Sequence, residues 1–145
     1  MRALHDTDVV LDALLRRAPF VVDSYALWQA CAAGRLEGWI SAITPVNVFY
    51  IARKQVGADQ ARQHVADLLI AFQVISIDTA VLRAAQSLPM ADFEDAVQAA
   101  AAAAAGLDAV VTRNTRDYTG APLPILTPAE ALARLASAGQ PPIAP

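Results

Sequence analysis

The chain has 145 residues, of which 56% are hydrophobic and 17% charged, which fits one globular domain and argues against disorder. Its 11 Lys and Arg side chains against 14 Asp and Glu give a net charge of −3, which excludes binding of nucleic acid by bulk positive charge. No stretch reaches the roughly 18 apolar residues of a membrane span, and acids at positions 6, 8 and 12 interrupt any signal peptide. A single cysteine excludes a disulfide within the chain. We therefore expect a cytoplasmic protein.

Hydrophobic spacing and capping residues predict strands that alternate with helices. The run 73–77 has the β-branched character of a buried strand, whereas the apolar residues from Val9 to Leu14 recur at helical spacing. In the first half of the chain, the sequence predicts a strand over 3–5, a helix from 7, a helix over 24–33 capped by Ser24, a strand over 38–41, a helix from Thr44 to 55 and a helix from Asp59 to 71. In the second half, it predicts a strand over 73–77, a helix capped by Asp78, a helix from Asp92 to 105, a strand over 109–112, a short strand over 125–126 and a helix from Thr127 to 136.

Alanine dominates the helix that begins at Asp92 and ends before Gly106. Residues 99–105 are all alanine, and small side chains let a helix approach a sheet closely, so we expect a packing surface there. Cys31 lies in an apolar helix and is expected in the core. Residues 138–145 are expected to form a disordered tail after a single domain over 1–137.

Strands that alternate with helices favour a three-layer α/β/α sandwich with a central parallel sheet of four or five strands. In such sheets, ligands bind outside the carboxyl ends of the strands. Acidic residues gather at three such places: Asp6 and Asp8 after the first strand, 92–95 at a helix start, and Asp117 after the strand 109–112. Oxygen ligands from separate elements suit Mg²⁺ or Mn²⁺. The sequence therefore predicts a metal site on one rim of the sheet, where Asp6 and Asp95 converge.

Four segments together resemble the successive motifs of PIN-domain proteins. They are 4–12 (LHDTDVVLD), 41–44 (SAIT), 92–100 (DFEDAVQAA) and 111–118 (VTRNTRDY). The resemblance implies a parallel sheet between helices and a cluster of acids that binds Mg²⁺ or Mn²⁺ for the hydrolysis of single-stranded RNA. Many small members, the VapC-like ribonucleases, are toxins of bacterial type II toxin–antitoxin pairs, which implies an antitoxin protein and a homodimer as partners.

The resemblance also assigns roles to single residues. Asp6 and Asp95 match the acids expected to be catalytic residues and metal ligands. The further expected metal ligands are Asp92, Asn114 and Asp117, and the expected weak or indirect ligands are Asn47, Asp8 and Thr112. Asn47 stands where the family usually carries a glutamate, as in a subgroup with asparagine at this second acidic position. Because an amide oxygen brings no charge, we expect one tightly held ion instead of two.

The reaction implied by the resemblance is metal-assisted hydrolysis of a phosphodiester bond, in which a bound ion lowers the pKa of water. RNA must also be held against an acidic pocket, and arginine binds phosphate with two parallel hydrogen bonds. The candidate RNA-binding residues are Arg16, Arg17, Arg53, Lys54, Arg113 and Arg116. Arg113 and Arg116 flank the last motif and are the stronger candidates.

Two other readings of these residues are open. A degenerate PIN domain, with Asn47 and Asn114 in place of acids, could act as a non-catalytic RNA- or protein-binding module. Loss of Mn²⁺ binding in an Asp6→Asn variant would separate the nuclease from this module. The segment 6–8 also fits the Asp-x-Asp opening of haloacid-dehalogenase-like phosphatases, but these need a downstream lysine. Lys54, the single lysine, lies too early and in a helix.

Aromatic residues on the helix 44–55 point to association. Phe49, Tyr50 and Ile51 cannot all face inward, because successive helical residues lie about 100° apart. One aromatic side chain is therefore expected near the surface, where it could anchor a homodimer or receive a helix of an antitoxin.

Overall fold

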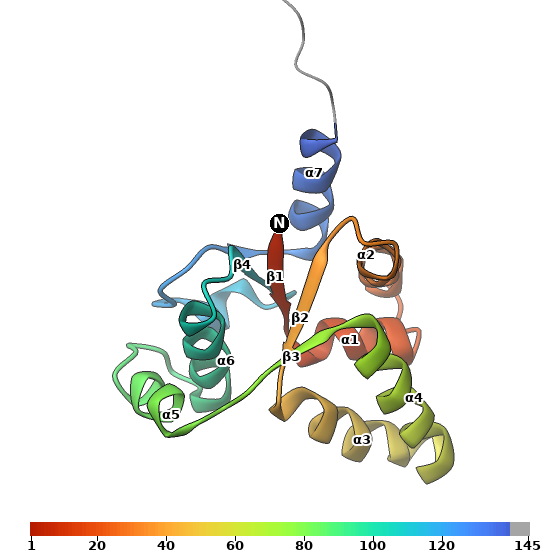
Figure 1. Ribbon diagram of the computed structural model, residues 1–145. Coiled ribbons are helices and arrows are strands. Elements are labelled where there is room, and N and C mark those ends of the chain that lie inside the picture. The colour runs from red at the N-terminus through yellow and green to blue at the C-terminus, as the bar shows by residue number, and fades with distance from the viewer. Residues whose placement is uncertain (140–145) are drawn as a thin grey trace, which may run out of the picture.

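A computed structural model describes residues 1–139, in which five strands form one sheet (Figure 1). The strands are β1 (Arg2–His5), β2 (Glu37–Ser41), β3 (Gln73–Ile75), β4 (Ala109–Val111) and β5 (Ile125–Leu126). All neighbours pair in parallel, in the order β3-β2-β1-β4-β5. The parallel sheet predicted from the sequence is confirmed, with five strands. Most of the predicted tail, residues 140–145, lies outside the described part of the chain.

Helices cover both faces of this sheet, which confirms the three-layer arrangement. They are α1 (Thr7–Leu14), α2 (Val21–Ala32), α3 (Ile43–Val56), α4 (Ala58–Ala71), α5 (Thr79–Gln86), α6 (Phe93–Ala104) and α7 (Pro128–Ala138), with a 3-10 helix η1 (Thr115–Tyr118). Figure 1 shows α5 and α6 on one side of the sheet and α1, α2 and α4 on the other. No helix within residues 1–139 is both long and apolar enough to cross a membrane.

The strands divide their side chains between two cores. Ala3, Ala109 and Val111 pack with α1, α2, α4 and α7, whereas Leu4 and Val110 pack with α5 and α6. This alternation follows from the two-residue period of a strand. Cys31 belongs to the first core, as expected from its apolar helix.

The alanine run packs against the sheet as predicted. Ala99, Ala101 and Ala102 are fully buried on α6, in the same core as Leu4 and Val110 of the sheet. Gly106 follows the helix at φ 66°, a left-handed conformation that glycine adopts without steric cost. The helix thus ends where the sequence predicts.

Three predicted helix caps are confirmed. Asp78, Asp92 and Thr127 each accept a hydrogen bond from a backbone N–H in the first turn of α5, α6 and α7. Thr127 and Glu130 form a reciprocal capping box, which fixes the start of α7.

Three other predicted helix starts are wrong, each by one to three residues. Ser24 lies inside α2, where its hydroxyl donates to the Phe20 carbonyl at 2.9 Å. Thr44 lies inside α3, and its hydroxyl instead pairs with Thr7 at 3.0 Å. Asp59 is the second residue of α4, after Gly57 at φ 83°. Ser and Thr hydroxyls can bond within a helix or across to another element, so their presence does not fix a boundary.

The strand order places β1 and β4 at the centre of the sheet, side by side. From β1 the chain proceeds to β2 and β3 on one side, and it returns to β4 and β5 on the other. Asp6 and Thr112 follow directly after these two strands. This reversal of strand order is where open α/β sheets bind ligands.

Candidate functional site

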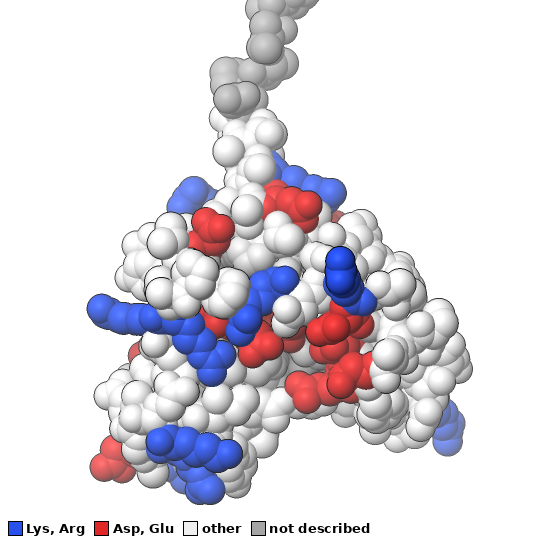
Figure 2. Space-filling model, turned by 180° about the vertical axis from the view of Figure 1, so that it is seen from behind, with Lys and Arg blue, Asp and Glu red and all other residues white. Residues whose placement is uncertain are grey.

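A pocket of about 360 Å³ opens at the carboxyl ends of β1 and β4. Figure 2 shows acidic side chains gathered beside a hollow on this face of the molecule. The pocket is lined by Asp6, Thr7, Asp8, Asn47, Ile51, Asp92, Glu94, Asp95, Asn114 and Asp117. The structure therefore brings together seven of the eight residues predicted as direct or weak metal ligands, and Asp6 and Asp95 lie on one rim of the sheet.

Asp6 is the most tightly held carboxylate of the pocket. It is 7% exposed, and its Oδ1 accepts a hydrogen bond from Gln98 Nε2 at 3.0 Å. Its Oδ2 accepts from Thr112 Oγ1 at 2.9 Å. Burial raises the pKa of Asp6, and these two hydrogen bonds oppose the rise. A carboxylate has about four lone-pair sites, so Asp6 can still bind a cation in the pocket that it lines.

Thr112, the predicted indirect ligand outside the pocket lining, connects two of its members. Its hydroxyl donates to Asp6 and accepts the backbone N–H of Asn114 at 3.1 Å. Asn114 in turn accepts the N–H of Asp117 through its carbonyl at 3.0 Å. The segment after β4 is thereby fixed against the end of β1, with Asn114 and Asp117 at the pocket.

Asp92 and Asp95 reach the pocket from the first turn of α6. Asp92 Oδ1 accepts the N–H of Asp95 at 3.0 Å and caps the helix. Burial raises the pKa of Asp95 to about 7, and the charges of Asp6, Asp92, Asp117 and Glu94 add to this effect. At neutral pH, the pocket thus carries crowded negative charge that a cation would neutralise.

Arg113 lies beside the pocket, where its Nη2 is 3.9 Å from Asp8 Oδ1, and its closest ion-pair partner is Asp12. Its Nε is 2.9 Å from Asp12 Oδ2, and its guanidinium stacks on Phe20 at 4.2 Å. Asp12 is 1% exposed, and Arg17 supports it at 3.7 Å. The structure therefore places Arg113, predicted to bind RNA, in an ion pair that joins the segment after β4 to α1.

The other predicted RNA-binding residues lie at different distances from the acids. Arg116 lines a smaller pocket together with Asp92 and Asp117. Arg16 lines a separate pocket with Trp28 and Cys31 of α2, and it does not reach the acidic one. Arg53 and Lys54 lie in the last turn of α3, beyond Ile51, with Arg53 stacked on Tyr50. Arg116 is therefore the arginine that best combines closeness to the acids with a side chain free of ion pairs among residues 1–139.

The donor set of the pocket fits Mg²⁺ or Mn²⁺, which prefer carboxylate, carbonyl and water oxygens. None of Asp6, Asp92, Glu94, Asp95 and Asp117 has an ion-pair partner within residues 1–139. In that same range, no three His, Cys, Asp or Glu side chains are already arranged to hold an ion. Binding would therefore require side chains on the open rim to move inward.

Two residues of the site were not assigned any role from the sequence. Gln98 is fully buried and fixes Asp6 from α6. The sequence could have indicated Gln98, because it is a lone polar residue beside the alanine run and lies one helical turn after Asp95. Glu94 lines the pocket and accepts a hydrogen bond from Asn47 Nδ2 at 2.9 Å. Its sequence position gave no such indication, because adjacent helical residues usually face different ways.

Asp95 should make the stability of the metal-free protein depend on pH. Its pKa rises from 3.8 to about 7 on folding, so between these values the folded chain holds a proton that the unfolded chain has released. This contribution should therefore lower the free energy of unfolding as the pH rises from about 4 to about 7, with little change above.

Thermal unfolding of the wild type and Asp95→Asn in EDTA tests this expectation. The comparison is needed because burial lowers the pKa of His5 from 6.5 to about 4, which acts in the opposite direction over the same range. The variant should be the more stable protein near pH 8 and should lose its advantage towards about pH 4. Parallel curves for the two proteins would contradict the raised pKa of Asp95.

Comparisons with known proteins agree with this geometry. A sequence profile described as PIN domain matches residues 2–116. No curated protein sequence matches the chain. A toxin–antitoxin complex from Klebsiella pneumoniae contains a chain of similar structure, with 27% identity, a TM-score of 0.64, and coverage of 87% of this chain and 97% of that one.

Two further solved structures share the fold at lower identity. VapBC2 from Rickettsia felis, bound to a DNA fragment from its promoter, has 17% identity and a TM-score of 0.70 over 88% of this chain and 98% of that one. VapC20 from Mycobacterium tuberculosis, a Sarcin-Ricin loop cleaving toxin, has 13% identity and a TM-score of 0.61 over 99% of both chains. These likenesses concern the fold.

Proposed function

Because this chain belongs to the PIN domain family, we propose that it is a cytoplasmic, metal-dependent endoribonuclease that hydrolyses phosphodiester bonds of single-stranded RNA. One observation carries the proposal. Asp6, Asp92, Glu94, Asp95 and Asp117 line a single pocket at the strand ends, and none has an ion-pair partner within residues 1–139. Such a pocket suits a divalent cation and, through it, the phosphate of a substrate.

In this proposal, Asp6 and Asp95 hold Mg²⁺ or Mn²⁺, with Asp92, Asn114 and Asp117 as further ligands on the rim. A bound ion would lower the pKa of water to give a nucleophile and would offset charge on the phosphate. Thr112 and Gln98 keep the Asp6 carboxylate turned to the pocket. Asn47 and Asp8 also line the pocket, and they would reach an ion through water.

The substrate phosphate would meet Arg116 first, because this arginine lines a pocket with Asp92 and Asp117. Arg16, Arg53 and Lys54 are proposed as more distant contacts along an RNA strand, and Arg17, at 3.7 Å from Asp8, as a contact beside the pocket. We propose that Arg113 contributes indirectly to RNA binding, because its ion pair with Asp12 fixes the segment after β4. Its guanidinium is already held by this carboxylate and by Phe20.

Cleavage of defined oligonucleotides tests the proposed function. The purified chain should cleave single-stranded RNA in Mg²⁺ or Mn²⁺ and lose this activity in EDTA. A single-stranded DNA and a double-stranded RNA of the same sequence are the matched controls and should be cleaved more slowly. RNA binding without cleavage in any of these ions would overturn the nuclease and point to the non-catalytic binding module.

We further propose that the protein is the toxin of a type II toxin–antitoxin pair. The structure from Klebsiella pneumoniae, at 27% identity, is a toxin–antitoxin complex, which supports an antitoxin partner for this chain. Expression of the chain alone should arrest growth, and co-expression of the neighbouring reading frame should restore it. Normal growth on expression of an active enzyme would contradict the toxin role.

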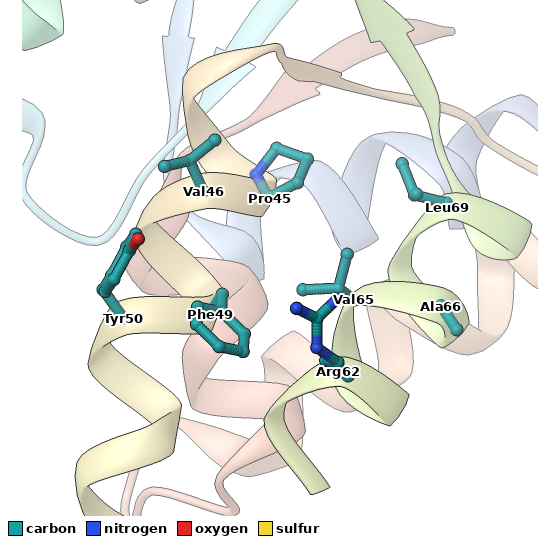
Figure 3. Close-up of a pocket in the computed structure, with 8 residues that line it drawn as sticks. All are labelled: Pro45, Val46, Phe49, Tyr50, Arg62, Val65, Ala66 and Leu69. Atoms are coloured by element: carbon teal, nitrogen blue, oxygen red, sulfur yellow. The ribbon is translucent and has the colours of Figure 1, made fainter. Parts of the chain in front are cut away.

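An apolar groove between α3 and α4 supports a homodimer (Figure 3). Phe49 and Val65 face each other across the groove, and Arg62 lies over the Phe49 ring at 5.5 Å. Val46, Tyr50 and Leu69 lie on its edges, each at least half exposed. The exposed aromatic residue expected from the helix spacing is therefore Tyr50.

Light scattering of the wild type at micromolar concentration should give about twice the chain mass of 15.3 kDa. Tyr50→Ala should weaken association, because truncation of an aromatic residue that anchors an interface costs about 2 kcal/mol, or roughly 30-fold in Kd. Val22→Ala is the control, since Val22 is 74% exposed on α2, outside this groove. A monomeric wild type, or equal masses for the wild type and Tyr50→Ala across a dilution series, would contradict this interface.

A further inference from the structure

Glu94 and Asn47 join two helices across the acidic pocket. Glu94 lies in the first turn of α6, and Asn47 lies in α3. Asn47 Nδ2 donates to Glu94 Oε1 at 2.9 Å, and both side chains line the pocket with Asp6 and Asp95. The amide of Asn47 thus holds the Glu94 carboxylate at the pocket, although Glu94 itself is exposed.

The surroundings of Glu94 are negative. Asp6, Asp8, Asp92 and Asp95 line the same pocket as Glu94. No Lys or Arg of residues 1–139 forms an ion pair with it. A neutral amide is therefore the partner of this carboxylate, and its charge remains to be neutralised.

A buried polar atom beside the pocket also lacks a partner. Among residues 1–139, Gln98 Oε1 accepts no hydrogen bond, and the Gln98 side chain is fully buried. Gln98 contacts Asp6 through its other amide atom. An unpaired buried polar atom is costly, and a hydrated cation would bring a water molecule to it.

We propose that Glu94 is a carboxylate ligand of the cation in this pocket and that Asn47 is the positioning residue that holds it. The proposal rests on the proposed metal-dependent function. In this proposal, the side-chain N–H of Asn47 donates to Glu94 and so positions this ligand. Glu94 on α6 supplies the negative charge that α3 lacks in this chain.

Mn²⁺ binding to the full chain without RNA tests the proposal, with free Mn²⁺ followed by electron paramagnetic resonance. Glu94→Gln keeps the shape of the side chain and should weaken Mn²⁺ affinity roughly 10- to 100-fold. Glu37→Gln removes an equal charge from a pair with Arg2 outside the pocket and should leave affinity unchanged. Circular dichroism and thermal unfolding show that each variant is folded.

A double variant sharpens the test. Asn47→Asp combined with Glu94→Gln moves the carboxylate from α6 to α3 across the 2.9 Å contact and should restore most of the lost affinity. A general loss of folding would not be restored in this way. Unchanged Mn²⁺ affinity in Glu94→Gln would overturn the ligand role.

The role of Glu94 can fail separately from the proposed function. If Asp6→Asn abolishes Mn²⁺ binding and Glu94→Gln does not weaken it, the site stands and Glu94 is not a ligand. If the wild type itself fails to bind Mn²⁺ at millimolar concentration, the metal-dependent function and the role of Glu94 are both wrong.

Discussion

Asp6→Ala and Asp95→Ala are each expected to reduce RNA cleavage by more than roughly 100-fold, because even indirect partners of metal ligands contribute about 10- to 100-fold. In the proposed function, each change removes a carboxylate that would hold the ion and orient its water. Initial rates over a range of Mn²⁺ concentrations measure the loss. High Mn²⁺ should not restore the rate if the carboxylate also orients the nucleophile.

The control for these variants is Asp59→Ala. Asp59 lies in the first turn of α4, as Asp95 lies in the first turn of α6, but it does not line the pocket. It therefore carries the same helix-dipole effect without the proposed chemistry. Equal cleavage by the wild type and Asp6→Ala would indicate a contaminating nuclease, and the enzymatic function would then be wrong.

Arg113→Met is expected to lower the free energy of unfolding by about 3 kcal/mol, since loss of one partner leaves a buried charge without compensation. The charge is that of Asp12, which is 1% exposed and 2.9 Å from Arg113 Nε. Arg17, at 3.7 Å from Asp12, still offsets part of this negative charge. The expected loss of stability is therefore at the lower end of the values for broken buried ion pairs. Urea denaturation measures the change through the midpoint at constant m-value.

The double variant Asp12→Asn/Arg113→Met should be more stable than Arg113→Met alone, because the buried charge is then removed with its partner. This recovery of stability distinguishes the contribution of the ion pair from that of the packing of the Arg113 side chain on Phe20. Additive losses in the two single variants and the double variant would show that the two residues do not interact in the folded protein.

Patterns that depend on local chemistry could be predicted from the sequence. The caps Asp78, Asp92 and Thr127 were correct, because each precedes a helix and accepts the backbone N–H of its first turn. The meeting of Asp6 and Asp95 was correct as well. Asp6 follows β1 directly, and Asp95 lies in the first turn of α6, the helix that runs back to the start of β4, so this turn lies at the carboxyl edge of the sheet.

Contacts between distant segments could not be predicted. Thr44 resembles a cap, but its hydroxyl pairs with that of Thr7, a contact that depends on where the two helices pack. The guanidinium of Arg113 pairs with Asp12 and Asp8, far earlier in the chain, and so is already partnered where a free arginine was expected to bind phosphate. Sequence spacing gives the order of such residues but not the directions of their side chains.

The alanine surface of α6 places few large side chains between the helix and the sheet, although Val97 is buried in the same core. The fully buried residues on this surface include Ala99, Ala101 and Ala102. Short methyl side chains do not interdigitate as leucines do, so they oppose a shift of the helix along its axis less strongly. The axial position of α6 must then come from polar contacts near its start, chiefly the bond from Gln98 to Asp6 and the link from Glu94 to Asn47. A cation held between Asp6 and the first turn of α6 would act as a further anchor. Metal loading should therefore slow hydrogen exchange along the whole alanine segment, far from the ion itself.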